Sequence, residues 1–323
     1  MVYISFPRED LNSHADLTAW RLRMNKRESD WKALKDFLAS QPRLRDDIHP
    51  LPKCWFSELP QGDPFARDVE HFRPKNRAAP LRLDQLEDLK KQLGIELRQV
   101  NTEGAYTWLE FDYRNYRLVT AITNRGGAKH VYFPIVQGSD RLDTNGLPWE
   151  TKEYPYFLDP TDAHDASLLS VLPDGRIQPR TPITDLTNAD FADLPNSWHS
   201  SGFNYIRAAV TIQLYRLNES VFVAGRKEVY DSINESMSQL LLCFRLEPKN
   251  LSIDLQNKII KSLKNAALPS APFSLAARCA LEAYVPPIEI DESSRRAIAL
   301  IPPQILRWID AKIAGLTCSW ENP

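Results

Sequence analysis

The stretch that decides the fold of this chain lies at residues 68–75 and reads Asp68-Val69-Glu70-His71-Phe72-Arg73-Pro74-Lys75. It ends in Pro74-Lys75, which disfavours a regular helix or a plain surface strand. A carboxylate directly before a histidine can hold a divalent cation while the imidazole, which titrates near neutrality, accepts a proton from water. Arg73 and Lys75 would add charge directed at phosphate. The alternative is a solvated turn in which His71 has no chemical role.

A second stretch, residues 106–134, completes the pattern. It holds a Trp-Leu pair at 108–109, asparagines at 115 and 124, a Gly-Gly pair at 126–127, Lys129 with His130, and a closing Phe-Pro. Together the two stretches resemble the HNH endonucleases, in which a hairpin carries a metal-binding acid and a general-base histidine, and the next helix supplies an Asn or His ligand. The resemblance implies an α+β protein, mostly α-helical, with a ββα-metal (HNH) nuclease core embedded in it.

The resemblance is closest to the PtuB-like HNH proteins of Septu-type anti-phage systems and some retrons. Their pattern reads roughly C-x-x-C, D-x-E-H-F-x-P-K, W-L-x-Y, N-L-x-x-C-x-x-C-N and F-P. The second block is intact in this chain, and the third reads Trp108-Leu109-Glu110-Phe111, with phenylalanine at the place of the tyrosine. Asn115 and Asn124 correspond to the two asparagines, with one extra residue between them. The first cysteine pair is replaced by Cys54 and Ser57, and the second by Thr120 and Thr123. The resemblance covers residues 50–285 and is strong only within 68–134.

The resemblance implies a role for each site residue. His71 is expected to activate water and Asn115 to orient the catalytic loop. Glu70 and Asn124 are expected to hold a Mg²⁺ or Mn²⁺ ion, since hard cations prefer carboxylate and amide oxygens, and Asp68 is a further candidate ligand.

Contact with the scissile strand is expected from four basic side chains: Arg73, Lys75, Lys129 and His130. Arg73 and Lys75 could equally pair with local acids. Further along, Glu153 and Asp159 leave two interpretations open, metal ligands or surface acids, of which surface acids are preferred.

The implied function is metal-dependent cleavage of nucleic acid, with DNA expected rather than RNA, as the effector of an anti-phage defence system. PtuB-like proteins work beside an ABC-type (PtuA-like) ATPase, and this chain has no P-loop or dinucleotide-binding motif of its own. An ATPase partner subunit is therefore expected, with a second copy of the chain as the other candidate partner. The alternative function is a catalytically inactive HNH-like subunit for binding or assembly, motivated by the missing cysteines.

The missing cysteines also predict the absence of structural zinc, because such a site needs about four Cys or His ligands. Packing must then hold the core, and the expected cluster comprises Trp55, Phe56, Phe72, Trp108, Leu109 and Leu118. Aromatic packing can take over from a metal when the surrounding chain is large enough to bury it.

Composition is that of an ordinary globular protein, with 323 residues, 43% hydrophobic and 25% charged. The formal net charge of -2 requires any nucleic-acid contact to come from local basic clusters. Four separated cysteines, no leader-like N-terminus and no run of about 18 apolar residues predict a soluble, cytoplasmic protein without membrane contact.

Three regions are predicted along the chain: an N-terminal helical arm at 1–48, the nuclease core at 49–200 with an insertion at 76–105, and a C-terminal helical domain at 201–323. In the insertion, a leucine stripe from Leu83 to Leu93 predicts a helix capped by Gly94. Two interpretations of this helix are open: it is a lid or docking helix, or it is part of the core.

Local patterns predict further elements. Residues 106–119 have a helical period, whereas the Gly-Gly pair predicts that the helix of the nuclease core is short or broken. Asp174-Gly175 predicts a small β-hairpin. The helical half, including a tail helix within 293–316, carries apolar stripes without a site, and we expect it to dock the partner.

Overall fold

The computed structural model describes residues 1, 3, 28–40, 44–63, 66–94, 96–110, 112–125, 127–139, 141, 153–181, 200–245 and 253–284. The predicted tail helix at 293–316 and most of the predicted N-terminal arm lie outside these residues. Within them, the elements in chain order are α2 (Glu28–Ala39), β1 (Arg67–His71), α3 (Leu83–Leu93), η3 (Thr107–Leu109), η4 (Tyr113–Asn115), β2 (Tyr116–Thr120), α4 (Ala121–Asn124), α5 (Ala163–Ser167), β3 (Leu169–Val171), β4 (Ile177–Pro179), α6 (Ser201–Leu214), α7 (Ser220–Arg245), α8 (Ile253–Ala267) and α9 (Ser274–Ala283).

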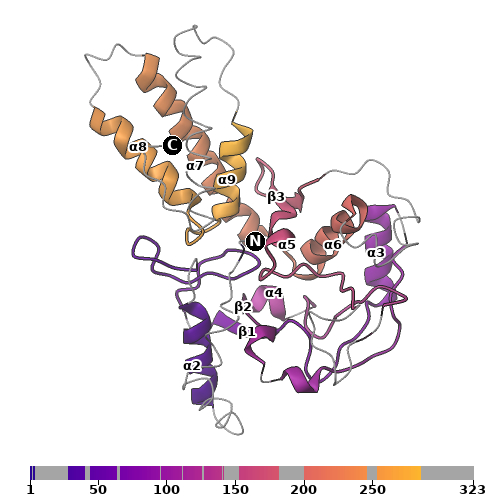
Figure 1. The fold of residues 1–323 in the computed structure, drawn as a ribbon. Helices are drawn as coiled ribbons and strands as arrows, with labels where there is room; N and C mark the ends of the chain where they lie inside the picture. Colours follow the sequence, from indigo (N-terminus) through magenta and orange to yellow (C-terminus); the bar gives the residue numbers. More distant parts are fainter. Residues whose placement is uncertain are drawn as a thin grey trace.

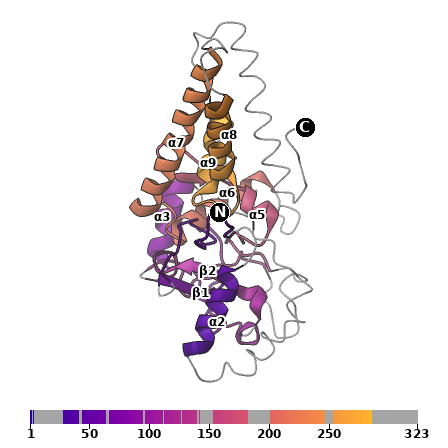
Figure 2. The same ribbon diagram turned by 90° about the vertical axis from the view of Figure 1, so that its left-hand side faces the viewer.

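The described residues form a mixed helix and sheet structure with small antiparallel sheets, which confirms the α+β class (Figure 1). In both views, α7, α8 and α9 lie side by side and project away from the part that holds β1 and β2 (Figures 1 and 2). The site is therefore built in the half of the molecule opposite the tip of these three helices.

A hairpin and a short helix carry the acid-histidine motif. Strand β1 pairs antiparallel with β2, so that Glu70 faces Arg117 and His71 faces Tyr116 across the ladder. Helix α4 follows β2 directly, and the Thr120 side chain caps it by accepting a hydrogen bond from the Thr123 backbone N–H. Helix α4 has only four residues, as the glycine pair after it predicts.

The helical period predicted for residues 106–119 is wrong. The structure forms the 3₁₀ turns η3 and η4 and then strand β2 over this stretch. All five residues of β2 are buried, so both of its faces are covered and the alternation that identifies a half-exposed strand is missing. A short, fully buried strand cannot be distinguished from a helix segment by periodicity.

Helix α3 forms where the leucine stripe predicts it, and Gly94 ends it with φ of 72°, in the left-handed region that favours glycine. Leu89 and Leu93 are buried, whereas Leu83 is 79% exposed. The helix packs against α6. Its inner face thus belongs to the core, which favours the core interpretation of the insertion.

The Asp-Gly turn closes the predicted hairpin, in which Val171 of β3 pairs with Ile177 of β4. Gly175 has φ of 86°, and a Cβ atom there would lie 2.2 Å from the Val223 carbonyl oxygen of α7. The turn therefore needs glycine for its conformation and for its close approach to α7.

One cluster of buried hydrophobic residues extends from the hairpin into the helices. Trp55, Phe56, Phe72, Leu109 and Leu118 are at most 3% exposed, and Trp108 packs against them, so the predicted aromatic core is confirmed. No helix among the described residues combines the length and the apolar character required to cross a membrane.

Cys54, Ser57, Thr120 and Thr123, the four positions at which the sequence pattern expects zinc ligands, lie close together. The Cys54 Sγ atom lies 4.0 Å from Thr123 Oγ1, which lies 3.3 Å from Thr120 Oγ1, and the Ser57 backbone N–H donates to Cys54 Sγ. All four residues are buried. Tetrahedral bonds of about 2.3 Å would place zinc-bound sulfurs about 3.8 Å apart, which is close to the 4.0 Å and 3.3 Å that separate the Cys54, Thr123 and Thr120 side-chain atoms.

We predict that the purified protein contains far less than one zinc ion per chain and unfolds at the same temperature with and without EDTA, because one thiol cannot hold the metal. Elemental analysis and thermal unfolding measure both quantities. The triple variant S57C/T120C/T123C is the positive control, since it should bind about one zinc ion. Stoichiometric zinc in the natural sequence would refute the prediction.

Candidate functional site

His71 lies at the end of β1, and a backbone carbonyl holds its ring. The Nε2 atom lies 3.0 Å from the Glu110 carbonyl oxygen. A carbonyl only accepts hydrogen bonds, so Nε2 carries the proton and the lone pair of the neutral ring is on Nδ1. The ring also meets the Tyr116 ring edge-on at 5.0 Å. This fixed tautomer is suited to taking up a proton at Nδ1.

Burial lowers the pKa of His71 from 6.5 to about 4, and the positive charges of Lys75 and Lys129 act in the same direction. The hydrogen bond to the Glu110 carbonyl opposes them. The ring is therefore neutral at pH 7, as a proton acceptor must be before reaction.

Glu70 points into the interior and is only 3% exposed. Its Oε1 atom lies 2.5 Å from the Lys129 ammonium and accepts a hydrogen bond of 3.0 Å from the Tyr215 hydroxyl. Burial raises the pKa of Glu70 and lowers that of Lys129. The Lys129 ammonium is fully buried and also donates to the His71 carbonyl oxygen at 2.8 Å, so it faces Glu70 and the backbone.

Asp68 faces the end of α4. The Arg125 guanidinium binds both carboxylate oxygens of Asp68, and the Asn124 side-chain amide donates to Oδ2 at 3.2 Å. A hollow of about 300 Å³ is lined by Lys35, Asp68, Val69, Asn124 and Arg125. The structure thus brings Asp68 and Asn124 together, whereas the contacts of Glu70 are elsewhere.

Asn115 clamps the segment after His71. Its Oδ1 atom accepts from the Arg73 backbone N–H at 2.8 Å, and its Nδ2 atom donates to the Arg73 carbonyl at 2.9 Å. The side chain is buried. Asn115 therefore sets the path of the segment after His71 through the Arg73 backbone.

Two of the basic residues that were expected to contact the substrate, Arg73 and Lys75, instead pair with carboxylates of the protein. Arg73 donates to Glu153 at 2.7 Å and is 11% exposed, and Lys75 pairs with Glu110 at 2.6 Å. Pairing with local acids, the alternative noted for both residues, is what the structure shows. His130, in contrast, is exposed.

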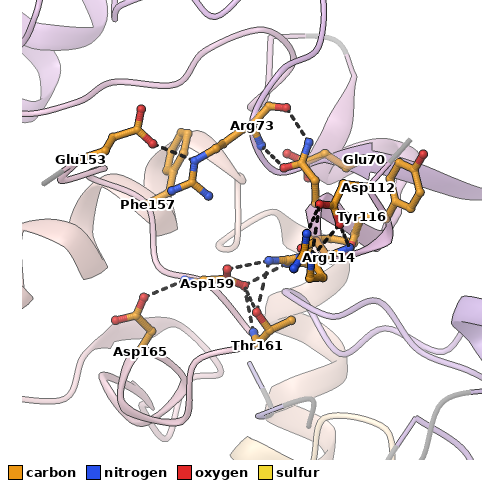
Figure 3. A network of polar contacts seen from close by, with 12 residues as sticks. Glu70, Arg73, Asp112, Arg114, Tyr116, Glu153, Phe157, Asp159, Thr161 and Asp165 are labelled. Carbon is orange, nitrogen blue, oxygen red and sulfur yellow. Dashed lines mark hydrogen bonds and ion pairs between the residues drawn. The ribbon is translucent and has the colours of Figure 1, made fainter. Parts of the chain in front are cut away.

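Glu153 and Asp159 are not surface acids. Glu153 is 5% exposed and pairs with Arg73, while Asp159 pairs with Arg117 through two hydrogen bonds (Figure 3). The preferred interpretation fails because each acid compensates an arginine that the core encloses.

Sequence reasoning missed the partners that hold the hairpin from behind. They are Arg117, Tyr215, and the buried pair of Arg207 with Asp165. The Asp165 Oδ2 atom also accepts a hydrogen bond from the Asp159 backbone N–H (Figure 3). The segment Glu153 to Asp159 was noted for its acids, but no signal in the sequence indicates which cation each acid meets. Tyr215 lies in a stretch that shows only a helical apolar period.

We predict that His71 titrates near pH 4, well below the 6.5 of a free imidazole. Between these values the unfolded chain binds more protons, so the stability from the neutral ring is complete above pH 6.5 and is lost as the pH falls towards 4. An NMR titration of the His71 ring and urea unfolding across this range measure both effects. His71→Gln should lose that part of the pH dependence, and a ring titrating at 6.5 would contradict the burial argument.

Comparisons with known proteins assign no family or function to the chain. No protein-family model, no curated protein and no solved structure matches the chain. The functional interpretation therefore rests on the residues and the geometry described above.

Proposed function

We propose that this chain hydrolyses phosphodiester bonds of nucleic acid, with His71 as the general base. The observation that carries the proposal is the hydrogen bond between His71 Nε2 and the Glu110 carbonyl at the end of an antiparallel hairpin followed by a helix. It sets the ring so that Nδ1 can accept a proton from water as the new phosphorus–oxygen bond forms.

Asp68 and Asn124 fit a hard cation better than Glu70 does. Both line the same hollow and offer a carboxylate and an amide oxygen. Among the described residues no three His, Cys, Asp or Glu side chains converge on one point, so water and phosphate would supply the remaining ligands, as is common for Mg²⁺. When bound, the cation would stabilise the charge that develops on the phosphoryl and leaving oxygens.

Arg125 acts as a stand-in cation on Asp68. Its side chain is 66% exposed and can turn into solvent, whereas the Asp68 side chain is 8% exposed and needs a cation beside it. Exchange of Arg125 for a metal ion therefore costs little, and the released guanidinium would be available to a phosphate.

The remaining groups position the reacting ones. Asn115 fixes the backbone after His71. Lys75 pairs with the side chain of Glu110, and the backbone carbonyl of the same Glu110 holds the His71 ring. Lys35, Arg125 and His130 are basic residues at or near the hairpin that suit a phosphate backbone. DNA as the preferred substrate, a defence role and an ATPase partner belong to the proposal and are supported by the sequence resemblance. A cytoplasmic location also belongs to the proposal and is supported by the four separated cysteines.

The second candidate function is an HNH-like subunit that binds or assembles without cutting. The observation that favours it is the occupation of Glu70 by Lys129, because an expected metal ligand is then already neutralised. The nuclease remains the preferred proposal, since the ring of His71 and the pair Asp68 and Asn124 do not depend on Glu70 as a ligand.

We predict that His71→Ala loses roughly 10²- to 10⁴-fold in cleavage rate while staying folded and binding nucleic acid, because only the proton acceptor is removed. The assay uses plasmid, single-stranded DNA and tRNA, with and without EDTA, and with and without any ATPase that the neighbouring genes encode. His164→Ala, a change of an exposed histidine, is the matched control and should cut normally. Full cleavage by folded His71→Ala would exclude this role, and a natural chain that binds but never cuts would support the non-cutting subunit.

We predict that Arg125→Ala lowers the Mg²⁺ concentration needed for half-maximal cleavage by about fivefold or more, because the competing cation is lost from a carboxylate that is only 8% exposed. Arg176→Ala removes a similarly exposed arginine from Asp174 and should leave the Mg²⁺ requirement unchanged. A higher requirement in Arg125→Ala would show that Arg125 does not compete with the metal.

A further inference from the structure

Glu70, Lys129 and Tyr215 form a buried polar cluster that the proposed chemistry does not use. The Lys129 ammonium lies 2.5 Å from Glu70 Oε1 and donates to the His71 carbonyl at 2.8 Å. The Tyr215 hydroxyl binds the same Oε1 atom at 3.0 Å. One ammonium thus joins the side chain of Glu70 to the backbone of the residue that carries the proposed base.

The cations on Asp68 and Glu70 differ in their access to water. Arg125 on Asp68 is 66% exposed, whereas the side chains of Lys129 and Glu70 are 0% and 2% exposed. A surface arginine can turn into solvent, but a buried ammonium that left its carboxylate would leave two uncompensated charges in the core. Displacement by a metal is therefore feasible at Asp68 and strongly opposed at Glu70.

The second oxygen of Glu70 does not provide another route. Oε2 is buried and has no hydrogen-bond partner among the described residues. A divalent cation that reached it would have to shed its water shell inside the core, which Mg²⁺ does reluctantly, and it would then share one carboxylate with an ammonium.

The backbone next to each partner of Glu70 is in an uncommon conformation. His130, directly after Lys129, has φ of 42°, and Arg216, directly after Tyr215, has φ of 52°. Non-glycine residues keep such angles only where the surrounding structure determines them strongly. Lys129 and Tyr215 each precede such a residue, and they reach Glu70 from segments far apart in the chain.

We propose that Lys129 is the resident cation of Glu70, so that Glu70 is a positioning residue for the His71 backbone and is not a ligand of a divalent metal. The inference deepens the proposed function by restricting its metal to Asp68 and Asn124. Metal binding and stability test it, so it can fail or succeed independently of cleavage.

The first test is a stability cycle on the full chain with Glu70→Gln, Lys129→Met and the double variant. Each single change leaves one buried charge without its partner, so the two losses in unfolding temperature should sum to more than the loss of the double variant. Lys227→Met, which removes a lysine from an exposed pair with Asp231, is the control for the methionine change and should have little effect. Additive losses would overturn the pairing.

The second test is Mn²⁺ binding followed by electron paramagnetic resonance, together with NMR of the His71 ring. Glu70→Gln should bind Mn²⁺ within about twofold of the natural chain, and Asp68→Asn at least about tenfold more weakly, a difference of about 1.4 kcal/mol. The ring signal of His71 should shift in Glu70→Gln and Lys129→Met because its backbone support is altered. Mn²⁺ binding that Glu70→Gln weakens as strongly as Asp68→Asn would overturn the proposal. If the natural chain binds no Mn²⁺, the metal proposal fails and the stability cycle alone decides the role of Lys129.

Discussion

The site depends on the neutralisation of charges that the hairpin carries into the core. An unpaired buried charge costs several kcal/mol, and each acid behind the hairpin meets a cation: Glu70 meets Lys129, Asp159 meets Arg117, and Asp165 meets Arg207. These pairs join β2 to the segment after residue 153 and to α6. The rigid frame they form fixes the end of β1, where the ring of His71 is held by the Glu110 carbonyl.

Burial divides the charged residues near His71 into two groups. The buried pairs, above all Glu70 with Lys129, support the backbone, and separating them would cost several kcal/mol of free energy. Asp68 and Asn124 instead border a hollow, and the cation on Asp68 is an exposed arginine. Under the proposed function, a metal ion would therefore bind only at Asp68 and Asn124, and Glu70, directly before the histidine, would support the fold.

Local signals in the sequence predicted the local features of the fold. Gly94 marked the end of α3, the Asp-Gly turn marked the β3–β4 hairpin, and the Gly-Gly pair marked the short α4. Strand β2 escaped prediction because it is buried on both faces. The contact of Tyr215 with Glu70 spans 145 positions and depends on tertiary packing. The pairing of Lys129 with Glu70 also depends on tertiary packing, because nothing in the sequence shows which acid a loop lysine will meet. The motif singled out His71, Asn115, Asp68 and Asn124, but it placed Asn124 with Glu70. The contact of Asn124 with Asp68 and the partner of each charge required the fold.

The most direct test of this account is to locate a bound cation on the intact chain by the broadening that Mn²⁺ causes in NMR signals. The account predicts that the Asn124 side-chain amide signal broadens at the lowest Mn²⁺ concentrations, that Glu70→Gln leaves this broadening in place, and that Asp68→Asn abolishes it. Broadening that survives in Asp68→Asn and disappears in Glu70→Gln would contradict the account, because Glu70 would then hold the metal and Lys129 would be its displaceable partner.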